Sequence, residues 1–352
     1  MNPDSKSFLK QLVETPSPSG YEQQVQHLVR ERFRPWCDEV KTDVMGNVFG
    51  IRNPAGHPRV MLAGHCDQIG FIVQFITDDG FIYVDMIGGV DPTVAVSQRV
   101  VIMTRRGLVP GVIGRKAIHL MDEADRKRVP KMDDLYVDIG AKTKKDVEKL
   151  ISLGDAGVFV QPFAELSNNR VVLMAFDNKM GTWIVAETLR LLHGKKMDAC
   201  IVGVSTVQEE IGLRGAQTSA FASEAGVGIA LDVGHATDCP GIDKKTVGDY
   251  RLGKGPKICR GANINPVVFD LLVETAKKEK IPYQISTAAG GTGTDANIMQ
   301  RTRAGMATGL LSVPLRYMHT PNELLSLDDL ENCAKLLAAF CARLKKDQDF
   351  TP

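Results

Sequence analysis

Histidine and acidic residues stand directly after several apolar, strand-like runs of this chain. Five runs have this form, RVMLAG, VVLMAF, IVGVSTVQ, VGIAL and ATGLLSVPLRYM, and they precede His65, Asp177, the pair Glu209 and Glu210, Asp232 and His319. Each run has the length and β-branched content of a buried strand. Because ligands bind beyond the carboxyl ends of strands in an open α/β sheet, we expect all five runs to bring these side chains to one edge of one sheet. Such a set could hold two divalent cations and supply a general base.

Each of these residues, taken alone, also has an ordinary structural explanation. A histidine at a strand end, such as His65, is more often hydrogen-bonded than bound to a metal, and Asp177 has a good residue type for a helix N-cap. His319 precedes a Thr-Pro turn and could cap nearby backbone, whereas Asp232 follows an apolar run with no exposed face to explain it. Because five separate runs end in residue types that bind hard or borderline metals, we favour a metal site.

The adjacent acids Glu209 and Glu210 carry the most information. Two neighbouring carboxylates repel each other and are costly to bury without a partner, and a bound cation removes that cost. Neighbouring strand residues point to opposite sides, so one acid can bind metal while the other accepts a proton from the bound water. The alternative is a solvated acidic strand end. Asp67, two residues after His65, could accept a hydrogen bond from the imidazole and fix its orientation.

A glycine-rich segment, AAGGTGTDA at residues 288–296, lies outside these runs. It lacks the Lys-Ser/Thr of a phosphate-binding loop and the spacing of a dinucleotide fingerprint. The segment is either a mobile turn before a helix or a loop that brings Asp295 and backbone amides close to a ligand. The other histidines are interpreted as surface or loop residues, namely His27, His57, His119, His193 and His235.

The elements that must position these side chains follow from the spacing of apolar residues. Residues 4–14 and 20–34 have helical spacing, and residues 39–51 read as strand, turn and strand. From residue 170 onward, strands alternate with amphipathic helices, the last at about residues 326–346. This alternation predicts an α/β fold with a mostly parallel sheet flanked by helices.

Residues 69–163 have a different pattern. They contain many short strand-like pieces separated by Gly, Pro and Asp, which predicts a small all-β barrel or sandwich. The charged stretch at residues 122–134 is interpreted as a surface loop. We therefore predict a catalytic domain formed by residues 1–68 and 164–352, interrupted by a β-rich domain at residues 69–163.

The composition of the chain limits which classes of binding partner and which cellular compartment we expect. The chain has 352 residues, a net charge of +1 and 43% hydrophobic residues, which is the ordinary globular range and gives no reason to expect a nucleic-acid partner. No stretch approaches the roughly 18 uninterrupted apolar residues of a membrane helix, and the start MNPDSKSFLK does not read as a secretory signal. The seven cysteines are scattered without a CxxC pair, which favours a reducing, cytoplasmic location over a disulfide framework or thiolate zinc site.

Six segments make the chain similar to a known family, and they are GHCDQIGF, FDNKMG, VQEEIGLRGA, ALDV, GGTGTDA and YMHTPNE. Their order and spacing resemble those of the deblocking or glutamyl-aminopeptidase-like metallopeptidases, also named tetrahedral aminopeptidases, across nearly the whole chain. The resemblance implies a phosphorylase/hydrolase-like catalytic domain of the zinc-exopeptidase type, with an inserted PDZ-like or barrel dimerisation domain. It also implies dimers that assemble into a hollow dodecamer.

The resemblance further implies two divalent metal ions per subunit, zinc or alternatively cobalt. The implied ligands are His65 and Asp232 for one ion, Glu210 and His319 for the other, and Asp177 as a bridge. Glu209 would be the general base, and Asp67 would support His65. Gln68 departs from the family, which usually has a glutamate there; because that acid is not an expected ligand, activity should survive, while substrate preference could differ.

These features together predict an enzyme, a metal-dependent aminopeptidase. It would hydrolyse the N-terminal residue from short peptides by means of a metal-bound water activated by a glutamate base. One alternative keeps the metals but changes the substrate, giving an N-acyl amino acid deacylase or a dipeptidase. A second alternative, from another class, is a non-catalytic peptide-binding or assembly protein.

Overall fold

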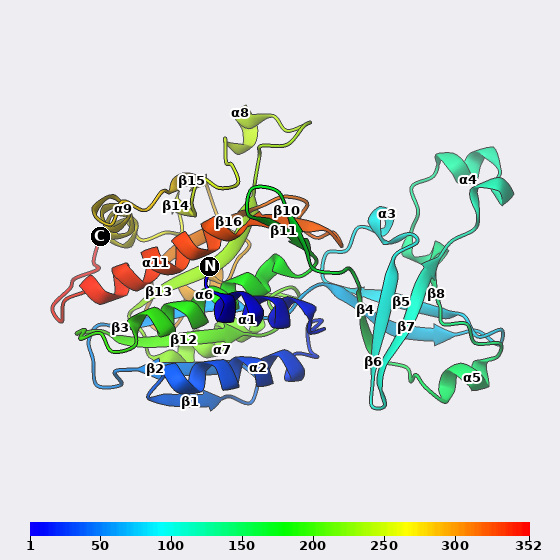
Figure 1. Cartoon of the computed structure of the whole chain (residues 1–352), viewed down its shortest axis with the longest axis horizontal. Coiled ribbons are helices and arrows are strands. Elements are labelled where there is room, and N and C mark those ends of the chain that lie inside the picture. The colour runs from blue at the N-terminus through cyan, green and yellow to red at the C-terminus, as the bar shows by residue number, and fades with distance from the viewer.

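A mixed eight-stranded sheet forms the centre of the larger part of the molecule (Figure 1). The computed structural model describes all 352 residues. In spatial order the strands are β1 (Glu39–Thr42), β2 (Val48–Arg52), β12 (Cys200–Thr206), β3 (Arg59–His65), β13 (Val227–His235), β16 (Ala307–Leu315), β14 (Lys257–Gly261) and β15 (Gln284–Ala288). Strands β12, β3, β13 and β16 run parallel to one another and are almost fully buried, as parallel strands covered on both faces should be.

Helices cover both faces of this sheet, which confirms the predicted α/β class. The longer ones are α1 (Pro3–Glu14), α2 (Gln23–Phe33), α6 (Phe176–Leu192), α7 (Arg214–Ser223), α9 (Pro266–Lys278) and α11 (Leu327–Arg343). Helix α6 packs on β3, β12 and β13, and α9 packs on β14 and β16 from the same side. Helix α7 and the short α10 (Ala296–Met299) pack on the opposite side. No helix combines the length and the apolar character needed to cross a lipid bilayer.

The N-terminal elements confirm the predicted pair of helices and the strand pair after them. Helix α1 follows Asn2, whose side chain accepts a hydrogen bond from the backbone N–H of Ser5 and so caps the helix. Helix α2 ends at Phe33, just before the 3-10 turn η1 (Arg34–Trp36) that contains Pro35. Proline has no N–H with which to continue a helix. Strands β1 and β2 then pair antiparallel.

One strand is not where the sequence predicted it. The run VVLMAF was expected to end at the same sheet edge as the other runs, but its strand β11 (Arg170–Leu173) lies between β10 (Ala164–Leu166) and β17 (Glu323–Ser326) in a separate antiparallel sheet. Only alternate residues of β11 are buried, unlike those of the central strands. A short apolar run fits a half-buried strand as well as a central one, so periodicity could not separate the two.

Six short strands close into a barrel beside the main sheet. They are, in order around the barrel, β4 (Gly70–Ile76), β5 (Ile82–Ile87), β8 (Tyr136–Asp138), β7 (Gly107–Gly114), β6 (Arg99–Thr104) and β9 (Ala156–Phe159). The short helices beside them are α3 (Pro92–Ala95), η2 (Ile118–Leu120), α4 (Glu123–Lys127), η3 (Met132–Asp134) and α5 (Lys144–Glu148). Closure removes the open sheet edges that invite unwanted pairing. The predicted all-β insertion is thus a barrel, and the stretch read as a surface loop contains the exposed helix α4.

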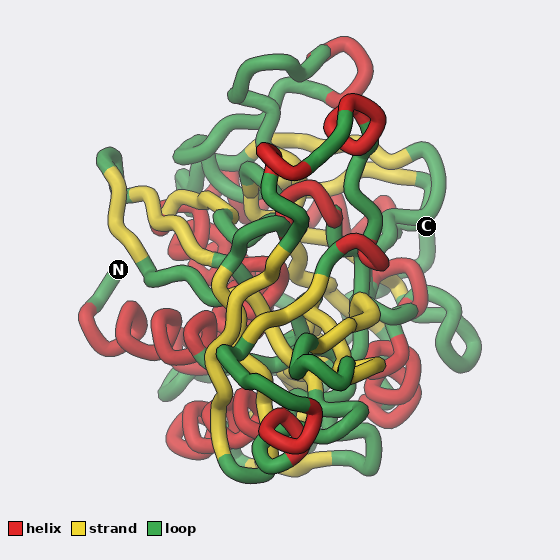
Figure 2. The backbone as a smooth tube through the Cα atoms, turned by 90° about the vertical axis from the view of Figure 1, so that its right-hand side faces the viewer, coloured by secondary structure: helices red, strands yellow, loops and turns green.

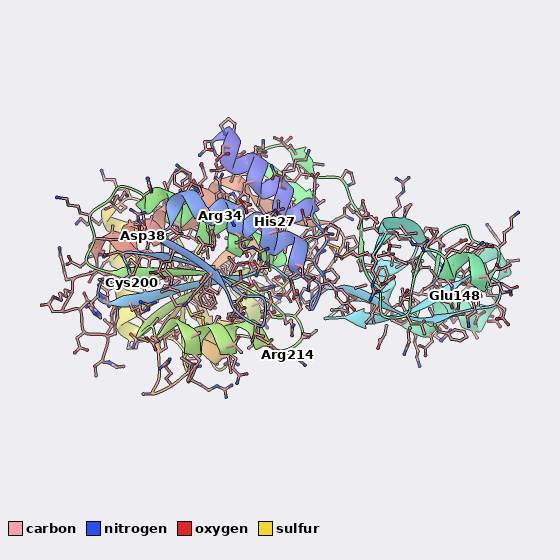
Figure 3. The ribbon with its side chains drawn as sticks, turned by 90° about the horizontal axis from the view of Figure 1, so that it is seen from below. His27, Arg34, Asp38, Glu148, Cys200 and Arg214 are labelled. Atoms are coloured by element: carbon pink, nitrogen blue, oxygen red, sulfur yellow. The ribbon has the colours of Figure 1, made fainter.

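The barrel has its own hydrophobic core. A cluster of 17 buried residues, all from this segment except Met174 and Ala175, is separate from the cluster of 63 around the main sheet. In Figure 3 the barrel, marked by Glu148, projects from the body that carries Cys200. Figure 2 looks from the barrel side and shows the two chain termini on opposite sides of the view. The strands of the barrel all fall within residues 69–163, whose role as a separate dimerisation domain stays a prediction.

Strand β3 packs closely against helix α6, and this contact helps to position the predicted site residues that the two elements carry. A Cβ atom added at Gly64 would overlap the backbone of Gly181 and lie 2.8 Å from the backbone nitrogen of Thr182. Backbone atoms cannot move aside as a flexible side-chain end can. We therefore expect Gly64→Ala to lower the free energy of unfolding by about 1–3 kcal/mol, the usual cost of overpacking a core.

Thermal or denaturant unfolding measures this effect. The matched control is Gly226→Ala, because a Cβ at Gly226 would meet no atom within 4 Å. That control should change the free energy of unfolding by less than about 0.5 kcal/mol. Equal stability of the two variants would show that the contact between β3 and α6 is not tight.

Candidate metal centre

The carboxyl ends of four adjacent strands carry most of the predicted site residues. His65 is the last residue of β3, and Asp232 lies near the end of β13. Glu209 and Glu210 follow β12 after a short turn, and His319 follows β16. Because β12, β3, β13 and β16 are neighbours in the sheet, these side chains meet at one edge, as expected from the sequence.

Asp177 reaches the same place by another route. It lies at the start of α6, which packs on β3 and β13. The backbone is not helical at Asp177 and Asn178, where ψ is 105° and 35°. The side chain that caps the helix after this kink is that of Asn178, whose Oδ1 accepts a hydrogen bond from the backbone N–H of Gly181 at 3.2 Å. The alternative interpretation of Asp177 as an N-cap is therefore wrong. Its carboxylate instead faces the residues at the sheet edge.

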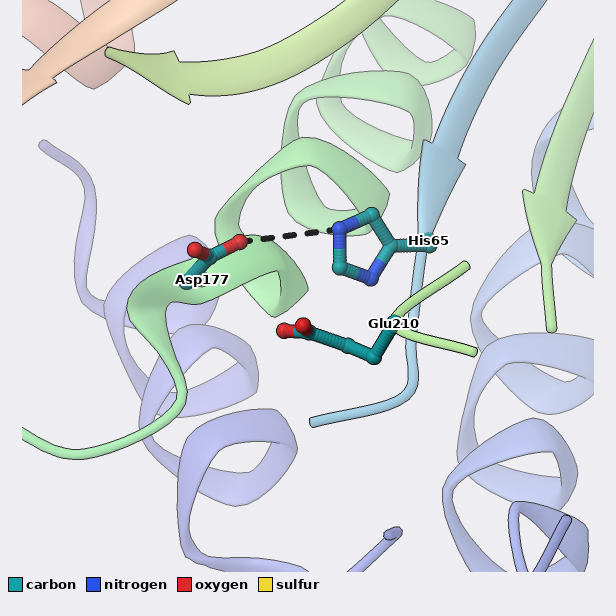
Figure 4. A group of neighbouring side chains, drawn as sticks. All are labelled: His65, Asp177 and Glu210. Carbon is teal, nitrogen blue, oxygen red and sulfur yellow. Dashed lines mark ion pairs between the residues drawn. The ribbon is translucent and has the colours of Figure 1, made fainter. Parts of the chain in front are cut away.

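The Asp177 carboxylate lies between two imidazoles. Its Oδ1 is 3.5 Å from Nε2 of His65, the contact drawn in Figure 4. Its Oδ2 is 3.3 Å from Nε2 of His319. Glu210 Oε2 lies 3.6 Å from the same nitrogen of His319, and Glu209 Oε2 lies 3.7 Å from Nε2 of His65. Each imidazole thus faces the shared aspartate and one acid of the adjacent pair.

Both imidazoles are held through their other ring nitrogen. Nδ1 of His65 is 3.1 Å from the carbonyl oxygen of Asp67 and 3.4 Å from its Oδ1. Nδ1 of His319 is 3.0 Å from the carbonyl oxygen of Gly89, which belongs to the barrel segment. When Nδ1 carries the proton and donates it to these oxygens, Nε2 is left unprotonated and able to bind a metal. The inserted segment therefore contributes directly to the site.

Asp67 organises more of the site than the sequence predicted. Its carboxylate is fully buried and accepts hydrogen bonds from the backbone N–H groups of Glu209 (3.1 Å) and Glu210 (3.2 Å). It also accepts a hydrogen bond from the Ser19 hydroxyl at 2.6 Å. One carboxylate thus fixes the turn that presents both glutamates, in addition to its contact with His65.

Sequence reasoning missed Ser19 and Glu323. Ser19 lies between the two predicted N-terminal helices, and nothing in its surroundings marks it as a partner of Asp67. Glu323 is only 2% exposed and accepts hydrogen bonds from the backbone N–H groups of Asp177 (3.0 Å) and His319 (3.1 Å). An acid directly before the apolar residues of β17 was the available sign that this carboxyl is buried. Glu323 ties the two segments that hold Asp177 and His319.

Burial disfavours the charged forms of the clustered acids. Burial is the main reason that the pKa of Glu209 is raised to about 8. Burial also raises the pKa of Glu210 well above the usual carboxyl range, and the negative charge of Asp177 raises it further. Burial likewise raises the pKa of Asp232 well above its usual range. Like charges this close are unfavourable unless a cation balances them. The cluster is therefore suited to binding positive charge.

Two overlapping groups of side chains are close enough to hold ions. His65, Asp177 and Glu210 form one group, and His65, Glu209 and Asp232 form the other; within each, one ligand atom per residue lies within 4.8 Å of the rest. The Oε1 atom of Glu210 is buried without a hydrogen-bond partner. An orphan acceptor among imidazoles and carboxylates suits a divalent cation such as zinc or cobalt. The residues present therefore fit a metal centre.

Gln68 lies beside this centre and not within it. Its Oε1 accepts a hydrogen bond of 2.5 Å from Nζ of Lys179, which also donates to the carbonyl oxygen of Thr15 at 2.5 Å. Burial lowers the pKa of the Lys179 ammonium to about 7. The contact joins the end of β3 to the first turns of α6.

A cavity of about 950 Å³ opens at the metal centre. The site residues that line it are His65, Asp177, Glu209, Glu210, Asp232 and His319.

Residues 291–294 of the glycine-rich segment line another wall of this cavity, which supports their interpretation as a loop beside a ligand. Helix α8 (Lys244–Val247) lies at the rim. Asp295 does not line the cavity, and its Oδ2 accepts a hydrogen bond from Thr206 at 2.7 Å. His235, interpreted as a surface or loop residue, ends β13 and lines the cavity.

Comparisons with known proteins match this architecture over almost the whole chain. The model of the M42 glutamyl aminopeptidase family matches residues 46–336. A lysyl aminopeptidase of Pyrococcus furiosus is 40% identical over 98% of this chain and 99% of its own length.

Two solved structures have the same fold. The TET aminopeptidase of a marine-sediment Thaumarchaeota archaeon has a TM-score of 0.92 and 34% identity, covering 97% of this chain and 96% of its own. The Pyrococcus horikoshii TET1 peptidase, described as able to assemble into a tetrahedron or a large octahedral shell, has a TM-score of 0.86 and 30% identity, covering 97% and 100%.

Proposed function

Because the chain belongs to the M42 glutamyl aminopeptidase family, a family of peptide-bond hydrolases, we propose that it is a dinuclear-metal aminopeptidase acting on short peptides. Because the family consists of peptidases, the alternative of a non-catalytic peptide-binding or assembly protein is set aside. The observation that carries the two-metal proposal is the Asp177 carboxylate, which presents one oxygen to His65 and the other to His319. A carboxylate in that position suits a bridge between two cations.

We assign one ion to His65 and Asp232, and the other to Glu210 and His319. Zinc is the proposed metal and cobalt the alternative, since imidazole and carboxylate ligands accept both. Bound cations would supply Lewis acidity, lowering the pKa of a water molecule and polarising the carbonyl of the bond to be cut.

Glu209 is the proposed general base. It accepts a proton from the attacking water and returns that proton to the leaving amine. The Asp67 carboxylate accepts a hydrogen bond from the backbone N–H of Glu209, and this contact fixes the position of the proposed base beside the cavity. Asp67 also orients His65 through its carbonyl and carboxylate oxygens.

A substrate panel tests the reaction class. Peptides with a free N-terminal amine and the same peptides with an acetylated amine should differ in kcat/KM by roughly 100-fold or more, because an exopeptidase of this kind uses the charged amine to position the first residue. The measurement uses protein reconstituted with zinc or cobalt. Preferential cleavage of the acetylated set would instead identify an N-acyl amino acid deacylase, and cleavage confined to dipeptides would identify a dipeptidase.

We also propose that the chain forms a homo-oligomer, with dimers that assemble into a dodecamer. The TET1 peptidase of Pyrococcus horikoshii provides the precedent for a large assembly of similar chains. The barrel offers a surface for self-association, because it exposes large apolar side chains, among them Leu108, Val112, Ile118, Leu120 and Val129. Contiguous exposed apolar patches commonly mark protein interfaces, and we propose that these side chains form one.

A further inference from the structure

The turn that presents the proposed base is held by side chains from three distant segments. Strand β12 ends at Thr206, and residues 207–210 then belong to no helix or strand. A backbone N–H without a partner in a sheet or helix needs another acceptor. Here four consecutive N–H groups donate to side-chain oxygens: Val207 to Asn47 (3.1 Å), Gln208 to Glu22 (3.1 Å), Glu209 to Asp67 (3.1 Å) and Glu210 to Asp67 (3.2 Å).

Gln208, the residue before the proposed base, has a strained backbone. Its φ is 55°, in the left-handed region that a residue with a side chain rarely adopts. Such a conformation persists only where the surroundings enforce it. The hydrogen bond from the Gln208 N–H to Oε1 of Glu22 fixes the peptide group that enters this strained residue. Because the direction of the Glu209 side chain follows from the backbone before it, this contact controls where the base points.

Glu22 makes this contact and does not cap its own helix. It lies at the N-cap position of α2, yet its side chain forms no capping hydrogen bond. The residue is 4% exposed, and its Oε1 also accepts a hydrogen bond from the N–H of Gly20 at 2.7 Å. Burial and the nearby charge of Asp67 raise the pKa of Glu22 to about 7, so a carboxyl group is costly in this place. Its contact with Gln208 explains why an oxygen acceptor is nevertheless buried there.

The loop that carries Glu22 is fixed on both sides of that residue's oxygen. The Ser19 hydroxyl donates to Asp67, and the Tyr21 hydroxyl donates to the carbonyl oxygen of Gly154, in the barrel segment, at 2.6 Å. The position of the Glu22 side chain is therefore set relative to both the Asp67 carboxylate and the barrel. A group that positions another must itself be held in this way.

We propose that Glu22 is a positioning residue for catalysis, which acts through the backbone of Gln208 to keep Glu209 within reach of the attacking water. This inference goes beyond the proposed aminopeptidase function and rests on it. Glu22 does not line the cavity, so it acts only through the turn. Its contribution then depends on the reach of its Oε1 atom and not on its charge.

Two variants separate reach from charge in the metal-reconstituted, full-length protein. Glu22→Gln keeps an oxygen at the same reach and loses the charge, whereas Glu22→Asp keeps the charge and withdraws the oxygen. We expect Glu22→Gln to retain kcat on a free-amine peptide to within about threefold. Glu22→Asp should lower kcat by roughly 10- to 100-fold with little change in KM, the cost of a misplaced catalytic group. Glu31→Asp, the same change at an exposed position of α2, is the control.

A double-mutant cycle tests whether Glu22 acts through the base. Once Glu209 has been replaced by glutamine, its position no longer matters for proton transfer. Adding Glu22→Asp to Glu209→Gln should therefore lower kcat by less than about threefold, although it costs far more in the wild-type background. Equal losses in both backgrounds overturn the proposal, because Glu22 would then act by another route.

Hydrogen exchange of the metal-free protein gives a readout that does not depend on turnover. The amides of residues 207–210 should be protected in the wild-type protein and in Glu22→Gln, and should exchange roughly 10-fold faster or more in Glu22→Asp. Circular dichroism confirms folding; if Glu22→Asp does not fold, Glu22→Ser, which also withdraws the oxygen and suits an N-cap, takes its place.

The remaining outcomes decide separate points. Unchanged protection in the variant with the withdrawn oxygen, or a Glu22→Gln protein as slow as Glu22→Asp, overturns the positioning role while the aminopeptidase function stands. If the metal-loaded wild-type protein cleaves no free-amine peptide, the proposed function fails and this inference fails with it.

Discussion

Replacing Asp177 by asparagine should prevent the binding of a pair of divalent cations and reduce peptide hydrolysis by about three orders of magnitude or more. The carboxylate presents Oδ1 to His65 and Oδ2 to His319, at 3.5 and 3.3 Å. An amide of the same size has only one oxygen and no charge, so it cannot serve both cations. The remaining ligands would then belong to two incomplete sites.

Metal content and stability measure this loss without relying on activity. For each ion bound, the wild-type protein should gain about 2.7 kcal/mol in free energy of unfolding when zinc or cobalt is present at 100 times its dissociation constant, and Asp177→Asn should gain much less. Elemental analysis should give two ions per wild-type subunit and fewer in the variant. Asp347→Asn makes the same chemical change at an exposed position and is the control. Two ions bound by an active Asp177→Asn protein would remove the bridge from the proposal.

The convergence of four strand ends could be predicted because it follows from one rule. Apolar runs that end in His65 and Asp232, or shortly before Glu209 and His319, identify the strands, and parallel strands bring their carboxyl ends to one edge. The rule failed for Asp177, since β11 lies in another sheet and the residue arrives through α6 instead. The prediction that Asp177 joins the cluster therefore held for a different structural reason than the one given.

Contacts that depend on strand order could not be predicted. Asp232, Ser312 and Lys257 form one row of paired residues because β16 lies between β13 and β14, although β14 precedes β16 in the chain. Nothing in the local sequence specifies that order. In the same way, the hydrogen bond from Ser19 to Asp67 joins a turn to a strand end 48 residues away, and no local pattern encodes such a contact.

The barrel is part of the site as well as a separate body. It has its own core, yet the carbonyl oxygen of Gly89 lies 3.0 Å from Nδ1 of His319. A Cβ atom at the preceding Gly88 would lie 3.3 Å from Cβ of Glu210, so the two segments are in close contact. The orientation of one proposed metal ligand therefore depends on a segment inserted between two strands of the catalytic part. An assembly built through the barrel would be coupled to the geometry of the metal centre.

The exchange of Glu209 for glutamine should leave the metal in place and reduce kcat by roughly 100- to 10,000-fold, the contribution of a general acid–base group. Glutamine preserves the volume of the side chain and the backbone N–H that donates to Asp67, but it cannot accept a proton from water. The fall should occur at saturating substrate, because the defect lies in proton transfer and not in binding. Glu279→Gln, an exposed glutamate, is the control for the chemical change itself.

Metal analysis of the Glu209→Gln protein distinguishes a base from a ligand. Glu209 belongs to one of the two groups close enough to hold an ion, together with His65 and Asp232, so a role as ligand is geometrically available to it. If Glu209 is the base, the Glu209→Gln protein should bind two ions but show little turnover. If Glu209 is a ligand, the variant should lose bound ions and turnover together. Full turnover with two ions bound would assign the proton transfer to another group. Glu210, whose Oε1 has no partner, would then be the residue to exchange next.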